Sequence, residues 1–131
     1  MEMKIGFAGK KMVTAQFDGF TVTTDQPVEA GGEGSAPSPF ELFLASLGTC
    51  AGLFALSFCR KRGLPTDGLE LTQTAVWDET AHRVSKIVLR IRLPKDFPEK
   101  YRDSVAAAAA LCTVKKHLQS PPDFEIVAEP G

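Results

Sequence analysis

Three cysteines are the residues of this chain with the greatest capacity for chemistry. They stand at Cys50, Cys59 and Cys112 in a sequence of 131 residues. A thiolate is a nucleophile that can be oxidised, provided that its pKa is lowered and an oxidant can reach it. An odd number of cysteines with no visible secretory leader argues against a disulfide framework. We therefore expect a cytoplasmic protein whose thiols stay reduced unless they are catalytic, redox-active or metal-bound.

Cys50 lies in the middle of an expected helix, among small neighbours in the segment LGTCAG, residues 47–52. These neighbours would let a ligand or another backbone approach the sulfur. A packing role is the alternative, because unpaired cysteine is among the most buried residue types. Cys59 follows nine residues later and falls on the opposite face of an ideal helix, so we interpret it as structural.

Cys112 lies where an alanine-rich helix is expected to give way to a second, shorter one. Lys115 and Lys116 follow at three and four positions and would share its helix face. A helix start and nearby cations both favour a reactive thiol. A buried packing cysteine beside surface lysines is the competing interpretation, and the pattern leaves both open.

Composition argues against several other classes of protein. The only histidines are His82 and His117, and there is no C-x-x-C pair, so neither a metal site nor another cofactor is expected. A net charge of -1, with no block of like charge longer than residues 60–62, predicts no nucleic-acid binding. The uncharged run 42–59 reaches the length of a membrane span. Its small and polar residues and its strand-like flanks favour a helix buried in a soluble protein instead, so no membrane association is expected.

Local signals predict the elements that must position the cysteines. Alternating apolar residues over 2–24 predict a three-stranded meander, with Asp18-Gly19 as a two-residue type I′ turn. Residues 25–37 are rich in glycine and proline and predict a loop. The sequence SPFE, residues 38–41, is a capping box with proline at the first helical position. It should open a central apolar helix that runs to about Arg62.

The second half of the chain adds a hairpin and two helices. Alternation predicts strands around 69–77 and 87–93, joined by residues 79–83. A helix should begin at Pro98 and continue through the alanines at 106–110, followed by a short helix over 113–118 and a last strand over 124–128. The resulting order, βββ-α-ββ-α-α-β, predicts one α+β domain over residues 1–131.

Two segments around the cysteines form a familiar pattern. Residues 36–50, APSPFELFLASLGTC, resemble the first cysteine motif of the osmotically inducible protein C (OsmC) and organic hydroperoxide resistance family. Residues 111–114, LCTV, resemble its second motif. The element order agrees over nearly the whole chain, and the sequence looks closer to a less characterised OsmC-like branch than to the dedicated hydroperoxide reductases.

The resemblance implies an intertwined homodimer in which curved sheets wrap around central buried helices, with active sites at the interface. It also implies an activity: an apolar organic hydroperoxide oxidises Cys50 to a sulfenic acid, Cys112 resolves it, and a thiol reductant regenerates the pair. This order of reactions agrees with general thiol chemistry, in which a sulfenic acid condenses with a neighbouring thiol.

One position departs from the family pattern. Peroxidase members carry an arginine near the end of the first strand, which pairs with the motif glutamate, here Glu41, and stabilises the thiolate. Residues 1–59 contain no arginine, and Lys10 and Lys11 are the nearest equivalents. Lysine lacks the two-pronged geometry that locks a carboxylate. The alternatives are therefore a non-catalytic dimeric binder of an apolar small molecule, an OsmC-like protein without peroxidase activity, or a purely structural protein.

Overall fold

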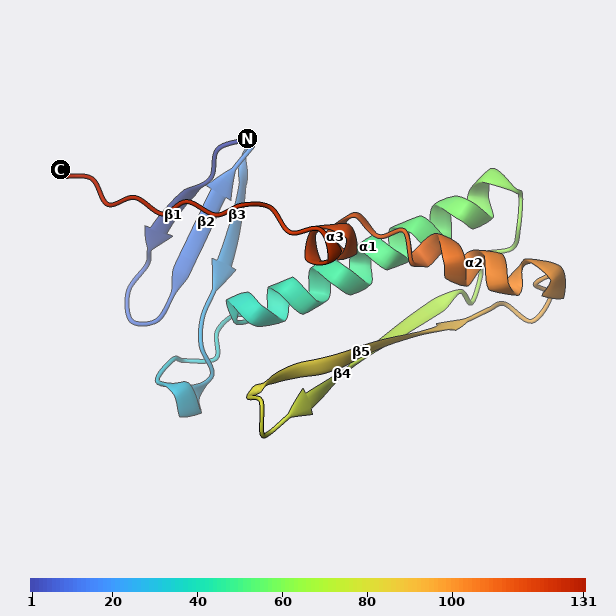
Figure 1. The fold of residues 1–131 in the computed structure, drawn as a ribbon, viewed down its shortest axis with the longest axis horizontal. Coiled ribbons are helices and arrows are strands. Elements are labelled where there is room, and N and C mark those ends of the chain that lie inside the picture. Colours follow the sequence, from blue (N-terminus) through green and yellow to red (C-terminus); the bar gives the residue numbers. More distant parts are fainter. The chain divides into compact units, whose positions relative to one another are not determined.

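The computed structural model describes residues 1–131, which separate into two compact units, Met1–Ala45 and Ser46–Gly131. We describe each unit by itself. Along the chain (Figure 1) the elements are β1 (Lys4–Phe7), β2 (Val13–Phe17), β3 (Phe20–Thr24), η1 (Val28–Ala30), α1 (Pro39–Lys61), β4 (Glu70–Asp78), β5 (Arg83–Arg92), η2 (Glu99–Tyr101), α2 (Arg102–Ala109) and α3 (Thr113–Gln119).

The first unit contains the predicted meander, with β1, β2 and β3 antiparallel and in that order. The hairpin turn between β2 and β3 has positive φ at both central residues, 47° at Asp18 and 80° at Gly19. Two such residues define the type I′ turn, whose twist matches that of the flanking strands. The turn brings Phe17 opposite Phe20, with ring centroids 6.0 Å apart. The meander predicted from alternation is therefore confirmed.

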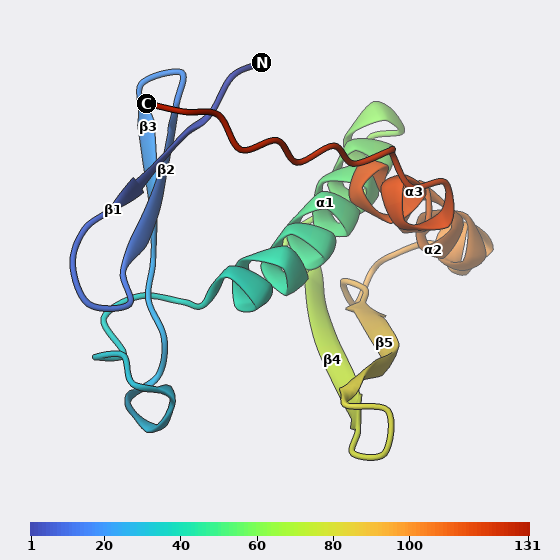
Figure 2. The same cartoon turned by 60° about the vertical axis from the view of Figure 1, so that its left-hand side comes forward.

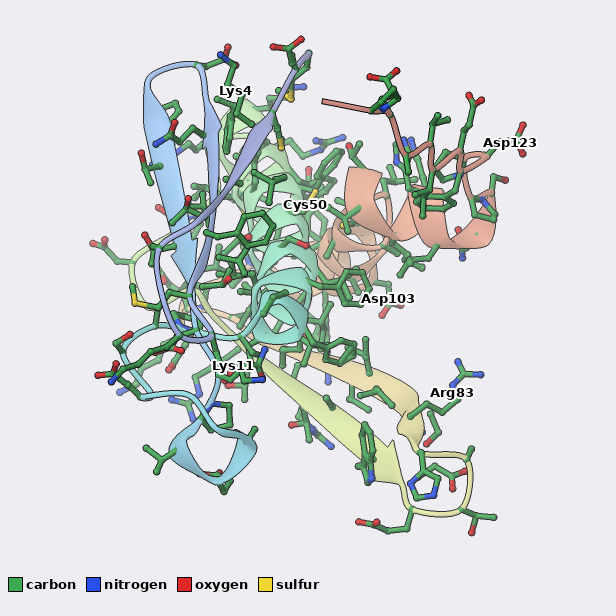
Figure 3. The ribbon with its side chains drawn as sticks, turned by 90° about the vertical axis from the view of Figure 1, so that its left-hand side faces the viewer. Lys4, Lys11, Cys50, Arg83, Asp103 and Asp123 are labelled. Carbon is green, nitrogen blue, oxygen red and sulfur yellow. The ribbon has the colours of Figure 1, made fainter.

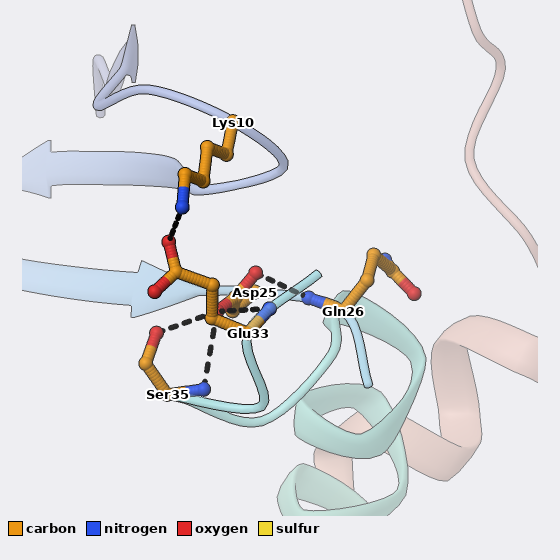
Figure 4. Close-up of polar contacts among 5 residues, drawn as sticks. All are labelled: Lys10, Asp25, Gln26, Glu33 and Ser35. Carbon is orange, nitrogen blue, oxygen red and sulfur yellow. Dashed lines mark hydrogen bonds and ion pairs between the residues drawn. The ribbon is translucent and has the colours of Figure 1, made fainter. Parts of the chain in front are cut away.

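A buried aspartate organises the loop that follows the meander. The carboxylate of Asp25 accepts hydrogen bonds from the Ser35 hydroxyl at 2.5 Å and from the N–H groups of Gln26, Ser35 and Glu33 at 2.7, 3.1 and 3.3 Å (Figure 4). These bonds, that of the Ser35 hydroxyl first, lower the pKa of Asp25 to about 2. The charged carboxylate thus accepts backbone N–H groups of this loop that would otherwise need partners in a helix or a sheet. Sequence analysis predicted the loop but not this residue.

The same loop leaves no room for a side chain at Gly32. A Cβ there would lie 2.0 Å from the carbonyl oxygen of Gln26 and 2.8 Å from Oδ1 of Asp25. We expect Gly32→Ala to displace the loop and lower the melting temperature in circular dichroism. Gly52→Ala is the matched control: a Cβ at that helical position meets nothing within 4 Å, and alanine favours helix. Equal melting temperatures for the two variants would show that the Gly32 packing is unimportant.

Local sequence motifs set both ends of helix α1. The Ser38 N–H donates to Oε1 of Glu41 at 3.1 Å, and the Glu41 N–H donates to Oγ of Ser38 at 3.2 Å, which is the predicted capping box. The helix ends at Lys61, one residue earlier than expected, and Gly63 follows with φ of 62°. A left-handed glycine in this place closes the last turn, so both ends arise from local chemistry.

The core of the second unit is built from small side chains. Figure 2 shows the β4–β5 hairpin and α2 beside α1. The buried residues are Ala51, Ala55, Cys59, Val105, Ala109 and Cys112, and partly buried residues packed against them include Leu89, Ile91 and Leu93. Small residues let the helices approach closely, and the apolar face of the hairpin covers them.

A single chain buries only one face of α1. The buried positions Leu47, Ala51, Ala55 and Cys59 follow each other at intervals of four, whereas Leu53 on another face is 59% exposed. By length and composition α1 would be long and apolar enough to cross a membrane, a test that core helices of soluble proteins also pass. Packing in this core accounts for the apolar residues of the buried face alone.

The prediction of a strand over residues 124–128 is wrong. No helix or strand follows α3, and Phe124 and Ile126 are 85% and 95% exposed. Alternating apolar residues give a segment the capacity to form a strand, but a strand also needs a neighbour to accept and donate its backbone hydrogen bonds. No other strand of this chain pairs with the segment, so the observed order is βββ-α-ββ-α-α.

Candidate thiol site

Cys112 is fixed in place by the start of α3. It is the N-cap residue of that helix, and its sulfur accepts a hydrogen bond from the Lys115 N–H at 3.5 Å. The thiol also lies 3.8 Å from the carbonyl oxygen of Leu47, to which it donates. The side chain is buried, with 2% exposed. The cap thus holds Cys112 against α1 at a point less than one turn before Cys50.

Cys50 belongs to helix α1 and is labelled in Figure 3. The partly buried Cys50 packs against the core cluster that contains Cys112, and hydrogen bonding from residues 112–114 lowers the pKa of its thiol. The Val114 N–H contributes most to lowering the pKa of the Cys50 thiol, and this set of donors outweighs the burial that raises it. A thiol that ionises below its ordinary pKa and is only half-buried meets both conditions for reactivity.

The structure therefore brings together two cysteines that are remote in sequence. Cys50 is the more accessible of the two, and the buried Cys112 thiol lies 3.8 Å from the carbonyl oxygen of Leu47, three residues before Cys50. A disulfide requires Cα atoms within about 7 Å and suitably directed side chains. Because the Cys112 thiol reaches the carbonyl oxygen of Leu47, three residues before Cys50, neither cysteine has to cross the molecule.

Cys59 has a different environment. It is fully buried in the core, and burial raises the pKa of its thiol. A thiol kept protonated and away from solvent is unreactive. This placement accords with our interpretation of Cys59 as a packing residue.

The other three candidate residues, Glu41, Lys10 and Lys11, belong to the first unit, where Glu41 and Lys10 make polar contacts. Glu41 caps α1, and hydrogen bonding from Ser38, its backbone N–H first, lowers the pKa of the Glu41 carboxyl. Lys10 has φ of 51° and forms an ion pair with exposed Glu33 at 2.8 Å (Figure 4). Lys11 follows it, with its stem beside Gly31. Direct roles for these residues at the thiol stay predictions.

An apolar cavity of about 370 Å³ adjoins Cys112. Small-molecule sites commonly have volumes of about 300–1,000 Å³ and mostly apolar walls. Lys115 supplies the single charge in the wall, so the space suits a molecule that is largely hydrocarbon. The lining residues come from α1, β5, the α2 region and α3: Leu47, Ala51, Ile87, Leu89, Ile91, Ala106, Ala109, Ala110, Cys112, Lys115 and Leu118.

Sequence reasoning missed the donors that surround Cys50. Two of them are backbone N–H groups and one is the hydroxyl of Thr113, all in the first turn of α3. The available signal was that the first N–H groups of any helix lack acceptors within it. The chain offers no group of three or more His, Cys, Asp or Glu side chains that could hold a metal ion.

Comparison with known proteins gives one family match and several structural neighbours. The family model described as OsmC-like protein matches residues 32–127. A search of curated proteins found no match. Among solved structures, a Psychrobacter arcticus 273-4 protein, provisionally described as an osmotic stress induced and detoxification response protein, is 25% identical, with 87% of this chain and 85% of that chain covered and a TM-score of 0.74.

Two further solved structures share the fold. An OsmC like protein from Mycoplasma pneumoniae is 17% identical, covers 92% of this chain and 87% of its own, and has a TM-score of 0.72. A Legionella pneumophila protein described as an organic hydroperoxide resistance protein OsmC is also 17% identical, with coverages of 90% and 88% and a TM-score of 0.60. These likenesses confirm the predicted α+β fold class.

Proposed function

Because the chain belongs to the OsmC-like protein family, we propose that it is a thiol-dependent peroxidase that reduces organic hydroperoxides. Cys50 is the peroxide-reactive thiol and Cys112 the resolving thiol. The observation that carries the proposal is that the buried Cys112 thiol lies 3.8 Å from the carbonyl oxygen of Leu47, three residues before a half-buried Cys50 whose pKa is lowered. A packing pair would need neither the lowered pKa nor the array of donors around one sulfur.

The first step oxidises Cys50. Its thiolate attacks the terminal oxygen of the hydroperoxide, ROOH, so that a sulfur–oxygen bond forms while the oxygen–oxygen bond breaks. Two electrons pass from sulfur to the peroxide, and the departing alkoxide takes a proton and leaves as the alcohol ROH. Cys50 becomes a sulfenic acid, the first rung of cysteine oxidation.

The second step uses the neighbouring cysteine. The Cys112 sulfur attacks the Cys50 sulfur, a disulfide forms as the sulfur–oxygen bond breaks, and the sulfenic hydroxyl takes the Cys112 proton and leaves as water. Two thiol groups of an external reductant then break the disulfide by exchange and are themselves oxidised. The placement of Cys112 beside the turn of α1 that carries Cys50 supports resolution within one chain.

The apolar cavity beside Cys112 supports an organic substrate. A hydrocarbon group can bury its surface there at about 25 cal/mol per Å², whereas hydrogen peroxide has none to bury. We also propose that the protein works as a cytoplasmic homodimer. Exposed apolar residues such as Leu53, Phe124 and Ile126 would be covered by a second copy.

A turnover assay tests the proposal. With dithiothreitol as reductant, purified protein should consume cumene hydroperoxide through many cycles and should consume hydrogen peroxide more slowly. Consumption should stop when the reductant is exhausted. Folded protein that removes cumene hydroperoxide no faster than dithiothreitol alone would refute peroxidase activity.

A non-catalytic binder of an apolar small molecule is the second candidate. The absence of arginine from residues 1–59 and the cavity of about 370 Å³ favour it. In that case a fluorescent apolar probe would bind to wild type and Cys50→Ala alike, and cumene hydroperoxide would leave all three thiols reduced.

A further inference from the structure

The apolar cavity beside Cys112 has one charged residue in its wall. The lining comes from α1, β5, the α2 region and α3, all within the second unit, and its side chains are hydrocarbon or thiol except at Lys115. No aspartate or glutamate takes part. A ligand in this space would therefore bury hydrocarbon against most of the wall and meet a cation at one place only. Small-molecule sites are commonly built in this way, with a few placed polar groups in a mostly apolar wall.

Lys115 has no acidic partner in this chain. The three ion pairs that form join Lys10 to Glu33, Arg92 to Glu70 and Arg102 to Glu99. The Nζ of Lys115 instead donates to the carbonyl oxygen of Ala110 at 3.4 Å. An ammonium group has three N–H donors, so this bond leaves two of them for a ligand, and no carboxylate neutralises the charge. An anion that enters the cavity would meet a cation that is not already paired.

The position of this lysine is set from two sides. Its backbone N–H donates to the Cys112 sulfur at 3.5 Å, and its Nζ bonds to Ala110, which also lines the cavity. The residue thus lies across the junction between α2 and α3, half-buried, with its ammonium group at the edge of the cavity. A side chain that is already held loses less conformational freedom when it binds a ligand. An ion pair in such a partly buried place is also stronger than one in open water.

We propose that the cavity binds amphiphilic monocarboxylates, with the hydrocarbon body against the apolar walls and the carboxylate paired with Nζ of Lys115. Lys115 is then the specificity-determining residue of the site. The volume of about 370 Å³ lies at the lower end of the usual range, which favours a medium-length chain over a bulky ring system. As a statement about the substrate, this inference rests on the proposed function, and it selects hydroperoxides that carry a carboxylate. As a statement about binding, it is independent of the peroxide group.

The test compares two probes with hydrocarbon chains of the same kind and needs no hydroperoxide. Octanoate is ionised near neutral pH, whereas octan-1-ol is neutral. Ligand-observed NMR titration of the reduced wild-type protein should show tighter binding of octanoate than of octan-1-ol, a comparison that needs no variant. Lys115→Met keeps an unbranched apolar stem without the charge. It should weaken octanoate binding by about tenfold and change octan-1-ol binding little.

Lys116→Met is the matched control. Lys116 is the next residue, exposed and not part of the cavity wall, so its substitution removes the same charge from the same helix and should leave octanoate binding unchanged. Thermal unfolding confirms that each variant is folded.

The outcomes separate this inference from the proposed function. Failure of wild type to prefer octanoate, or equal octanoate binding by wild type and folded Lys115→Met, would overturn the inference even in a protein that turns over cumene hydroperoxide. Equal weakening by both lysine substitutions would overturn it as well, because the effect would then come from net charge. Selective octanoate binding by a protein without turnover would support the site and refute the peroxidase function alone.

Discussion

Replacing Cys50 with serine is expected to abolish the dithiothreitol-dependent consumption of cumene hydroperoxide. A serine hydroxyl is not ionised near neutral pH and forms no sulfenic acid, so the first oxidation has no nucleophile. The hydrogen bonding that lowers the pKa of the Cys50 thiol favours an anion, and the introduced serine hydroxyl stays neutral. The turnover assay measures the loss, which should be complete.

Cys59→Ala is the matched control for that substitution. Cys59 lies on the same helix but is fully buried, with a pKa raised by burial, so its removal should leave turnover intact at the cost of a small cavity. If Cys50→Ser retained turnover, or if Cys59→Ala alone abolished it in folded protein, Cys50 would not be the peroxide-reactive thiol.

Replacing Cys112 with serine is expected to stop the reaction after its first oxidation. The Cys50 sulfenic acid then has no neighbouring thiol, so it persists long enough to be trapped by dimedone and goes on to the sulfinic acid with excess peroxide. Serine is also a favoured N-cap residue, so α3 should keep its start and its donors toward Cys50. The substitution therefore removes the resolving thiol while preserving the structure around the reactive one.

Mass spectrometry separates the two outcomes. Cys112→Ser treated with dimedone and hydroperoxide should carry the adduct at Cys50, whereas wild type should carry little, because the disulfide forms first. Equal thiol loss in wild type and Cys112→Ser, with no disulfide in wild type, would show that Cys112 does not resolve the intermediate.

Elements whose signals lie within a few residues were predictable from sequence. The Asp18-Gly19 turn requires positive φ at both residues, and the hydrogen bonds between Ser38 and Glu41 span three positions. Each of these short sequence patterns is therefore enough to predict its local structure. The strand over 124–128 failed for the opposite reason. Its alternation is local, but its hydrogen-bond partner is not, and no other strand of the chain supplies one.

The site was predictable in its residues but not in its surroundings. Two cysteine motifs pointed to Cys50 and Cys112, and their contact depends on how α3 meets α1, which no local pattern specifies. Asp25 was missed for the same reason, because the donors that give its carboxylate a role lie eight and ten residues away, across a loop. Lys10, the nearest equivalent of the missing arginine, pairs with Glu33, and the motif glutamate Glu41 forms the capping box with Ser38; their roles at the thiol stay predictions.

These placements change what the missing arginine implies. Stabilising a thiolate needs donors directed at sulfur, and a guanidinium is one source of them. In this chain the lowered pKa of Cys50 arises without an arginine, from hydrogen bonding by residues 112–114, the Val114 N–H first. If Cys112 resolves the sulfenic acid as proposed, ionisation and resolution would both depend on this segment.

The most direct measurement is the identity of the bond formed by one equivalent of cumene hydroperoxide. Trypsin leaves Cys50 and Cys59 on one peptide, so the Cys59→Ala protein is used, and the digest is mapped without reduction. We predict a linked pair of peptides that joins Cys50 to Cys112 and disappears on treatment with dithiothreitol. Oxidation of Cys50 to a sulfinic acid while Cys112 stays a thiol would contradict the account.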